Sequence, residues 1–261
     1  MALTTWPSVL EEYATIAKLQ AGASICRYGD GECKLMRDEA YVREPANAQL
    51  AAELRTIIAR PDSRCLVGIP TMDKRSPKYA NWRQRQAAFL PFLAPKVPYV
   101  SAFLTRPDSA PWILTESYAA SVEQLWAGKK VALVCEPTNK LVVVVKSAAR
   151  KVDHLACPSH GASAHIDAYE RHIVRGRPDL AILAHGVSAT VLAHRLACHG
   201  IQTLDLGSIG GMLARLLYLD KTPRSFPAVV HHPDCGDAQE MRDRLEACGF
   251  TVLYCAEKSD A

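Results

Sequence analysis

The chain has 261 residues, of which 49% are hydrophobic and 22% are charged, and its formal net charge is +4. This composition is ordinary for a globular protein, and the chain is long enough to bury a substantial core. The longest apolar runs, such as 141–145, are far too short to span a bilayer, which excludes a membrane-spanning protein. The mild positive charge permits an anionic ligand without requiring one.

Nine cysteines are scattered along the chain, and no Cys-x-x-Cys pair occurs. The odd number and the wide spacing predict reduced, mostly buried thiols rather than a disulfide framework. The first residues contain neither the basic nor the apolar segment of a secretion signal. We therefore expect a cytoplasmic protein.

Apolar runs of strand length alternate with helix-length segments through most of the chain. The expected strands are 24–27, 64–69, 98–103, 130–135, 153–157, 179–184, 202–206, 227–231 and 250–255. The expected helices are 8–20, 32–38, 46–60, 78–91, 115–127, 163–174, 187–199, 208–218 and 237–248. This alternation predicts an α/β fold in which a mostly parallel sheet carries helices on both faces.

The segment from Pro223 to Pro227 is the best candidate for a boundary. We expect residues 1–222 to form the main domain, and residues 223–261 to add one strand–helix–strand unit packed on it. In open α/β sheets, ligands bind outside the carboxyl ends of the strands. That rule selects the loops 27–32, 70–75, 105–108, 136–140, 185–190 and 207–211.

The first of these loops is the most informative, because Gly29-Asp30-Gly31-Glu32 follows a strand that ends at Arg27. Two carboxylates separated by one residue supply hard oxygen ligands of the kind that Mg²⁺ and Mn²⁺ prefer. Arg27 is placed to neutralise a phosphate, and the glycines let the backbone approach a ligand. This pattern suggests an enzyme that handles a nucleotide or a nucleotide sugar. The alternative is an ordinary Asp-Gly turn whose glutamate favours the helix dipole.

Two later corners add candidates for phosphate binding. Arg106 lies just past a strand, where it is suited to pair with a diphosphate or with Asp30; a solvated surface arginine is the alternative. The corner at 185–190 joins a glycine turn to a helix start whose N–H groups suit phosphate, and a plain N-cap is the alternative. Its candidate residues are His185, Gly186, Ser188 and Thr190.

A third corner, at 205–211, is rich in glycine. Asp205 at the strand end is suited to hold a ribose or sugar hydroxyl, and Gly207 and Ser208 follow it. The alternative is that the glycines serve only close helix packing.

The segment 73–85 is basic, with aromatic residues between the charges. It is suited to an anionic groove, including one for nucleic acid, whereas the alternative is a solvated face of an amphipathic helix. Acceptor contacts are expected here, with the aromatic rings stacking on a sugar or the cations contacting DNA phosphates. The candidates are Lys74, Arg75, Tyr79 and Trp82.

The stretch Arg27-Tyr28-Gly29-Asp30-Gly31-Glu32 resembles the Arg-aromatic-Gly-Asp-Gly-Glu signature of the GT-D-type glycosyltransferases. Segments 101–107, 185–190 and 204–209 resemble later parts of the same family in the same order. The resemblance implies a Rossmann-like GT-D fold and a metal-dependent hexosyltransferase that uses a nucleotide-sugar donor. It makes Asp30 and Glu32 the catalytic Asp-x-Glu motif, which holds Mn²⁺ or Mg²⁺.

The resemblance also implies donor contacts from Arg27, Gly29, Gly31 and Arg106, and from the corners at 185–190 and 205–208. The chain departs from the family at Ser208, where histidine is common, and at Gly210, where an acid follows. The expected reaction moves a UDP-linked sugar to a hydroxyl of a glycan or glycoprotein. One alternative is transfer to a hydroxymethylated pyrimidine in DNA. Others are a metal-dependent phosphohydrolase and a nucleotide-binding module without catalysis.

Overall fold

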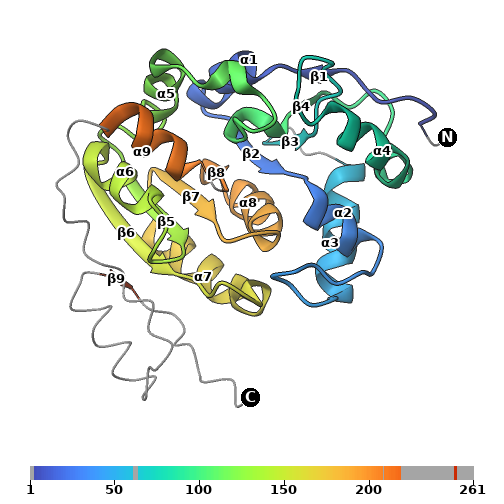
Figure 1. The fold of residues 1–261 in the computed structure, drawn as a ribbon. Coiled ribbons are helices and arrows are strands. Elements are labelled where there is room, and N and C mark those ends of the chain that lie inside the picture. The colour runs from blue at the N-terminus through green and yellow to red at the C-terminus, as the bar shows by residue number, and fades with distance from the viewer. Residues whose placement is uncertain (1–2, 61–63, 208, 219–249, 252–261) are drawn as a thin grey trace.

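A computed structural model of the protein describes residues 3–60, 64–207, 209–218 and 250–251. Within these residues, one parallel sheet carries helices on both faces, which confirms the predicted α/β class (Figure 1). None of the helices in the described residues is both long and apolar enough to cross a membrane. The cysteines of the described core are free thiols, and all but the exposed Cys198 are buried.

The sheet has the strand order β1-β4-β3-β2-β8-β7-β5-β6-β9, and every neighbouring pair is parallel. The strands are β1 (Val9–Leu10), β2 (Ser24–Arg27), β3 (Cys65–Ile69), β4 (Tyr99–Ser101), β5 (Lys130–Cys135), β6 (Lys151–Ala156), β7 (Leu180–Ala184), β8 (Thr203–Asp205) and β9 (Phe250–Thr251). At the centre, Ile25 of β2 pairs with Leu66 of β3 on one side and with Leu204 of β8 on the other.

The helices connect these strands as crossovers, which parallel pairing requires. The α-helices are α1 (Glu12–Gln20), α2 (Asp30–Met36), α3 (Ala48–Ala59), α4 (Tyr79–Phe89), α5 (Glu116–Glu123), α6 (Leu141–Ala148), α7 (Ile166–Gly176), α8 (Ser188–Cys198) and α9 (Gly210–Tyr218). Short 3₁₀ helices are η1 (Leu90–Phe92), η2 (Ala102–Thr105), η3 (Pro111–Ile113) and η4 (Ala162–His165). Helices α3, α7 and α8 pack together on one face of the sheet, and α1, α5, α6 and α9 pack on the other (Figure 1).

The structure corrects the expected elements at two places. Val9–Leu10 is a short edge strand that pairs with β4, although the sequence predicted a helix over 8–20. The valine-rich run Leu141–Ala148 is helix α6, which the sequence did not predict because β-branched residues favour strands. Its buried residues, Leu141, Val142, Val144 and Val145, recur at the spacing of one helix face.

The predicted C-terminal unit, 223–261, falls outside the described residues except for β9. The strand at 227–231 and the helix at 237–248 therefore stay predictions. The described part of the unit, Phe250–Thr251, extends the sheet by pairing parallel with β6, where Phe250 is opposite His154.

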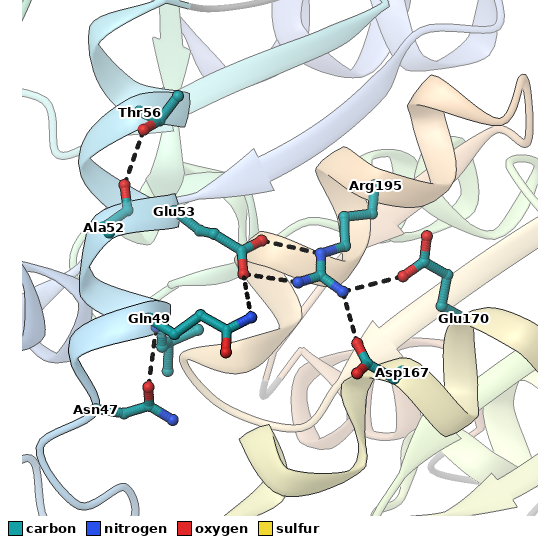
Figure 2. Close-up of polar contacts among 9 residues, drawn as sticks. Asn47, Gln49, Ala52, Glu53, Thr56, Asp167, Glu170 and Arg195 are labelled. Carbon is teal, nitrogen blue, oxygen red and sulfur yellow. Dashed lines mark hydrogen bonds and ion pairs between the residues drawn. The ribbon is translucent and has the colours of Figure 1, made fainter.

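An ion-pair network joins the three helices on one face (Figure 2). Arg195 of α8 donates from Nε and Nη2 to Glu53 of α3, at 2.9 and 2.6 Å. Its Nη1 donates to Asp167 at 2.8 Å and to Glu170 at 3.1 Å, both in α7. The hydrogen bond with Glu53 is the largest cause of a raised pKa for Arg195. The network fixes α3, α7 and α8 relative to one another on this face of the sheet.

Candidate active site

The chain continues in opposite directions from the two central strands, β2 and β8. From β2 it continues to β3 and β4 on one side, whereas the next described strand after β8 is β9, which lies beyond β6 on the other side. Such a reversal opens a crevice outside the carboxyl ends of the strands. The corners predicted from the sequence at 27–32, 185–190 and 205–207 meet at this edge.

Arg27 and Asp205 form a buried ion pair across the two central strands. Nη2 of Arg27 lies 3.0 Å from Oδ1 of Asp205, and their side chains are 12% and 5% exposed. Nε donates to the Asp205 carbonyl at 2.5 Å, and Nη1 donates to the Ala102 carbonyl at 3.3 Å and to the Thr105 hydroxyl. Because these contacts use the guanidinium inside the protein, they correct the predicted phosphate contact of Arg27: the residue positions the strand ends.

The carboxylate of Asp205, which the sequence predicted to hold a sugar hydroxyl, is occupied by its contacts with Arg27. Its Oδ2 accepts the main-chain N–H of Arg27 at 3.2 Å. Burial raises the pKa of Asp205, and the charge and hydrogen bonds of Arg27 oppose that rise. Asp205 therefore serves as the internal counter-charge of Arg27.

Both predicted metal ligands lie in the first turn of α2 rather than in the loop before it. Helix α2 begins at Asp30, and Oε2 of Glu32 accepts the N–H of Gly29 at 2.7 Å. Burial raises the pKa of Glu32 to about 7, and main-chain hydrogen bonds oppose part of that rise. The side chain of Asp30 is 35% exposed. The two carboxylates thus differ: one is open to a ligand, and the other is buried beneath it.

Two arginines lie close to these carboxylates. Nη1 of Arg85, in α4, is 3.0 Å from Oδ1 of Asp30. Arg106 forms two parallel hydrogen bonds to Asp108, at 2.8 Å each, which raise its pKa. The charge of Glu32 adds a smaller part of the same rise in the pKa of Arg106. The two arginines and their partners, Asp30 and Asp108, thus place positive and negative charges at the opening of the crevice.

Two of the predicted glycines are required by packing within the protein. A Cβ at Gly31 would clash with Cγ1 of Val187, which follows the turn after β7. A Cβ at Gly207, where φ is +52°, would clash with Nη2 of Arg27. Gly29, by contrast, would bring a Cβ only to 3.4 Å from Glu32, an ordinary contact. Gly31 therefore lets helix α2 pack closely against the turn between β7 and α8.

The corner after β7 divides into buried and open residues. Ser188 and Thr190 are fully buried, and their hydroxyls donate to the carbonyls of His185 at 3.3 Å and Arg27 at 2.8 Å. This corrects the expectation that these hydroxyls contact a ligand. Gly186 is exposed with φ of +80°, and a Cβ there would meet nothing within 4 Å. Ser208 lies outside the described residues.

The expected acceptor segment is less open than its sequence suggests. Trp82 is 7% exposed and packs against Phe89 and Phe103, so its ring offers no stacking face, which corrects that expectation. The Arg75 guanidinium donates two hydrogen bonds to Asp73, and its Cζ lies 4.7 Å from the centre of the Trp112 ring. Lys74 is exposed and Tyr79 half-buried; the Tyr79 hydroxyl accepts a hydrogen bond from Arg83 at 2.9 Å. Lys74 and Tyr79 thus keep access to solvent.

The structure also brings in residues that the sequence reading did not place in the site. The sequence predicts Arg85 only as one cation of the basic segment 73–85, and Thr105 only as part of the loop 105–108. Glu136 follows β5 and pairs with Arg43 at 3.1 Å, across the same edge. The loops after β4 and β5 were selected by the carboxyl-end rule, but nothing in the sequence paired Glu136 with Arg43, which is 93 residues away.

The described residues contain no group of three or more His, Cys, Asp or Glu side chains suited to hold a metal ion. Asp30 and Glu32 supply two carboxylates at one helix start. Mg²⁺ typically takes one or two protein carboxylates and completes its shell with substrate phosphates and water. A cation held at this helix start would therefore need further oxygen ligands from a phosphorylated ligand and water.

Burial of His185 makes the stability of the protein depend on pH. Burial lowers the pKa of His185 to about 3, below the ordinary value of 6.5. Between these values the unfolded chain holds a proton that the folded chain does not. The contribution of His185 to stability is therefore constant above pH 6.5 and is lost as the pH falls. We expect His185→Leu to remove about 1.4 kcal/mol of the stability loss between pH 7.5 and 5.5, measured by urea unfolding. Equal losses in both proteins would contradict this assignment.

Comparison with known proteins identifies the family. Residues 25–211, more than half of the chain, match the family described as Glycosyltransferase GT-D fold. The chain is 28% identical over 210 residues to the Probable glycosyl transferase Gly of Streptococcus gordonii, a match that covers 73% of this chain and 30% of that protein. It is 25% identical over 207 residues to Glycosyltransferase GlyD of Streptococcus pneumoniae serotype 4, with coverage of 73% and 25%. The chain thus spans less than a third of the length of these curated relatives.

Solved structures agree. One described as a new glycosyltransferase (DUF1792) from Streptococcus sanguinis matches with a TM-score of 0.69 at 25% identity, over 80% of this chain and 84% of that one. Another, described as the domain of unknown function 1792 with a distinct glycosyltransferase fold, has a TM-score of 0.73 at 24% identity, over 94% and 95%. The resemblance predicted from residues 27–32 is confirmed: the chain belongs to the family of glycosyltransferases with the GT-D fold.

Proposed function

We propose that the protein transfers a hexose from a UDP-linked donor to a hydroxyl group of a glycan or glycoprotein. The observation that carries the proposal is the pair Asp30 and Glu32 at the start of α2, with Arg106 in the loop after β4, at the carboxyl edge of a GT-D sheet. Carboxylates and an arginine at this edge suit a metal-bound diphosphate, which is the leaving group of such a donor.

A divalent cation, Mn²⁺ or Mg²⁺, fits the donor set and would act as a Lewis acid on the leaving diphosphate. Asp30 is the accessible ligand, and its partner Arg85 is a half-exposed counter-ion that can move aside. Glu32 keeps one carboxylate oxygen on the N–H of Gly29 and has the other for a ligand. Since two protein ligands hold a cation weakly, we expect the metal and the nucleotide to strengthen each other's binding.

Arg106 supplies fixed positive charge to the same diphosphate. Its bidentate contact with Asp108 holds the guanidinium plane in place, and a preorganised donor stabilises developing charge without reorganisation. Transfer breaks the bond between the anomeric carbon and the diphosphate oxygen, and it forms a bond to the acceptor oxygen, whose proton is released.

A glycan acceptor is favoured over DNA by the state of the basic segment. Arg75, Arg83 and Arg85 are each engaged by a side chain of the protein, respectively Asp73, Tyr79 and Asp30. Phosphate contacts from DNA would have to replace several of these bonds at once, whereas a diphosphate at Arg106 competes only with Asp108. A neutral acceptor leaves them intact.

Calorimetry with a panel of UDP-hexoses, with and without Mn²⁺, tests the proposal. We expect binding of at least one UDP-hexose that strengthens with Mn²⁺, and weak binding of Mn²⁺ alone. Arg106→Ala should lower the affinity for UDP by about 10- to 150-fold, because a hydrogen bond to a charged group contributes roughly 1.5–3 kcal/mol.

The matched control is Asp108→Asn, which releases Arg106 without removing its charge. Because Asp108 also holds the guanidinium in place, we expect this variant to bind UDP less tightly than the unaltered protein but more tightly than Arg106→Ala. Metal-independent binding that Arg106→Ala leaves unchanged would show that the diphosphate lies elsewhere.

A further inference from the structure

A small cleft at the carboxyl edge of the sheet contains an unsatisfied histidine. His185 is the first residue after β7, and it is 6% exposed. Within the described part of the chain, neither of its ring nitrogens has a hydrogen-bond partner. Its ring meets that of Tyr169 edge to face, with centroids 5.8 Å apart, and the Tyr169 hydroxyl donates to the Ala156 carbonyl at 3.2 Å. The imidazole is therefore held in place by packing while its polar atoms are unused.

Such an arrangement is costly to the fold. A buried polar group without a partner loses its hydration and gains nothing in return. An apolar side chain of similar size would fill the position without that loss. Unsatisfied buried groups in folded proteins are rare and call for a specific explanation, such as a missing ligand or water.

The cleft around His185 has the size and polarity of a site for one hydroxyl group. Its volume is about 10 Å³, close to the least that a single water molecule needs. Polar side chains from three loops line it beside the imidazole: Arg43, Glu44, Glu136 and Ser159. Arg43 and Glu136 are joined by the 3.1 Å ion pair, and Arg43 and Ser159 are exposed at the rim. A neutral imidazole can both donate and accept, which matches a hydroxyl group.

The cleft adjoins the carboxylates of α2 through one contact. Gly31, between Asp30 and Glu32, approaches Val187 so closely that a Cβ would clash. Val187 also lines the cleft. Val187 thus separates two places: the start of α2, where the proposed diphosphate lies, and the cleft of His185.

We propose that the cleft lined by His185, Glu136 and Ser159 is a subsite that binds one hydroxyl group of a sugar taking part in the transfer. His185 is the specificity-determining residue of this subsite. The inference rests on the proposed function. The hydroxyl belongs either to the hexose of the donor or to the acceptor sugar, and both sources present the same chemistry to the imidazole.

Three variants of the full chain test the subsite. His185→Leu removes both nitrogens and should raise the urea midpoint at pH 7.5, while lowering sugar affinity about tenfold. His185→Gln keeps a donor and an acceptor and should retain more of the affinity. Trp126→Phe is the control: Nε1 of Trp126 is likewise buried without a partner in the described residues, but it lies before β5, at the opposite edge. It should leave sugar binding unchanged.

The source of the hydroxyl is read from two titrations. If the donor supplies it, His185→Leu weakens binding of the UDP-hexose but not of UDP, and a monodeoxy donor that binds weakly to the unaltered protein loses nothing further in the variant. If the acceptor supplies it, donor binding is unchanged and the KM for a p-nitrophenyl hexoside rises about tenfold.

If His185→Leu binds the sugar nucleotide normally and has normal KM values, the subsite proposal is wrong, and an ordered water is the partner of His185. A lower urea midpoint with unchanged sugar binding would contradict the proposal in the same way. Failure of the unaltered protein to bind any UDP-hexose contradicts the proposed function itself, which is a separate result.

Discussion

Asp30→Asn and Glu32→Gln should each lower the rate of sugar transfer by roughly 100-fold or more, because a bound cation contributes several kcal/mol to the transition state. Each change removes one charge and keeps nearly the same volume. In Glu32→Gln the side-chain amide retains an oxygen that can accept the Gly29 N–H, so helix α2 should keep its first turn. Turnover of UDP-hexose, measured at saturating Mn²⁺, gives the result.

The matched control for these variants is Glu39→Gln. Glu39 is a half-exposed carboxylate shortly after α2, paired with Arg37 at 2.8 Å. We expect its loss to leave turnover within about twofold, since exposed pairs contribute little. Circular dichroism and urea unfolding establish that each variant is folded. Near-normal turnover in both Asp30→Asn and Glu32→Gln would remove the metal motif from the mechanism.

Arg27→Met should destabilise the protein by about 3–5 kcal/mol, the largest stability change that we expect from a single substitution at the site. The reason is the isolated Asp205 carboxylate, which is 5% exposed and would be left in the sheet without its counter-charge. The carbonyls of Ala102 and Asp205 would also lose their donors. Urea unfolding at pH 7.5 measures the effect.

The double variant Arg27→Met/Asp205→Leu separates the ion pair from the loss of packing. Replacing both partners of a buried pair with apolar groups is often neutral. We expect the double variant to recover most of the stability that Arg27→Met loses. Additive losses would show that Arg27 stabilises the strand ends without reference to the Asp205 charge.

The fold class was predictable because continuous apolar runs alternate with helix-length segments, and parallel strands buried on both faces leave that pattern. Helix α6 was not predictable in the same way. Its valines favour a strand locally, and the need for a crossover between β5 and β6 decides the matter only once the sheet order is known. Tertiary context overrides local preference there.

The candidate site was predictable as a set of loops but not as a set of contacts. The carboxyl-end rule selected corners that the structure brings together at one edge of the sheet, since the rule depends only on strand direction. It did not show that Arg27 faces Asp205, 178 residues away, or that Arg85 reaches Asp30. Trp82 illustrates the converse: an aromatic residue in a basic segment looks like a stacking platform, yet its ring completes the core.

The seam between β2 and β8 joins an early part of the chain to a late part, and this has a consequence for biosynthesis. Closing so long a loop carries an entropic cost, and contacts of large sequence separation form late in folding. When β2 leaves the ribosome, one of its hydrogen-bonding edges has no neighbour until β8 has been made. Until then the chain holds an unpaired arginine and an open strand edge, a state in which a holding chaperone would protect it from self-association. The crevice between β2 and β8 is therefore completed only when nearly all of the described sheet has been synthesised.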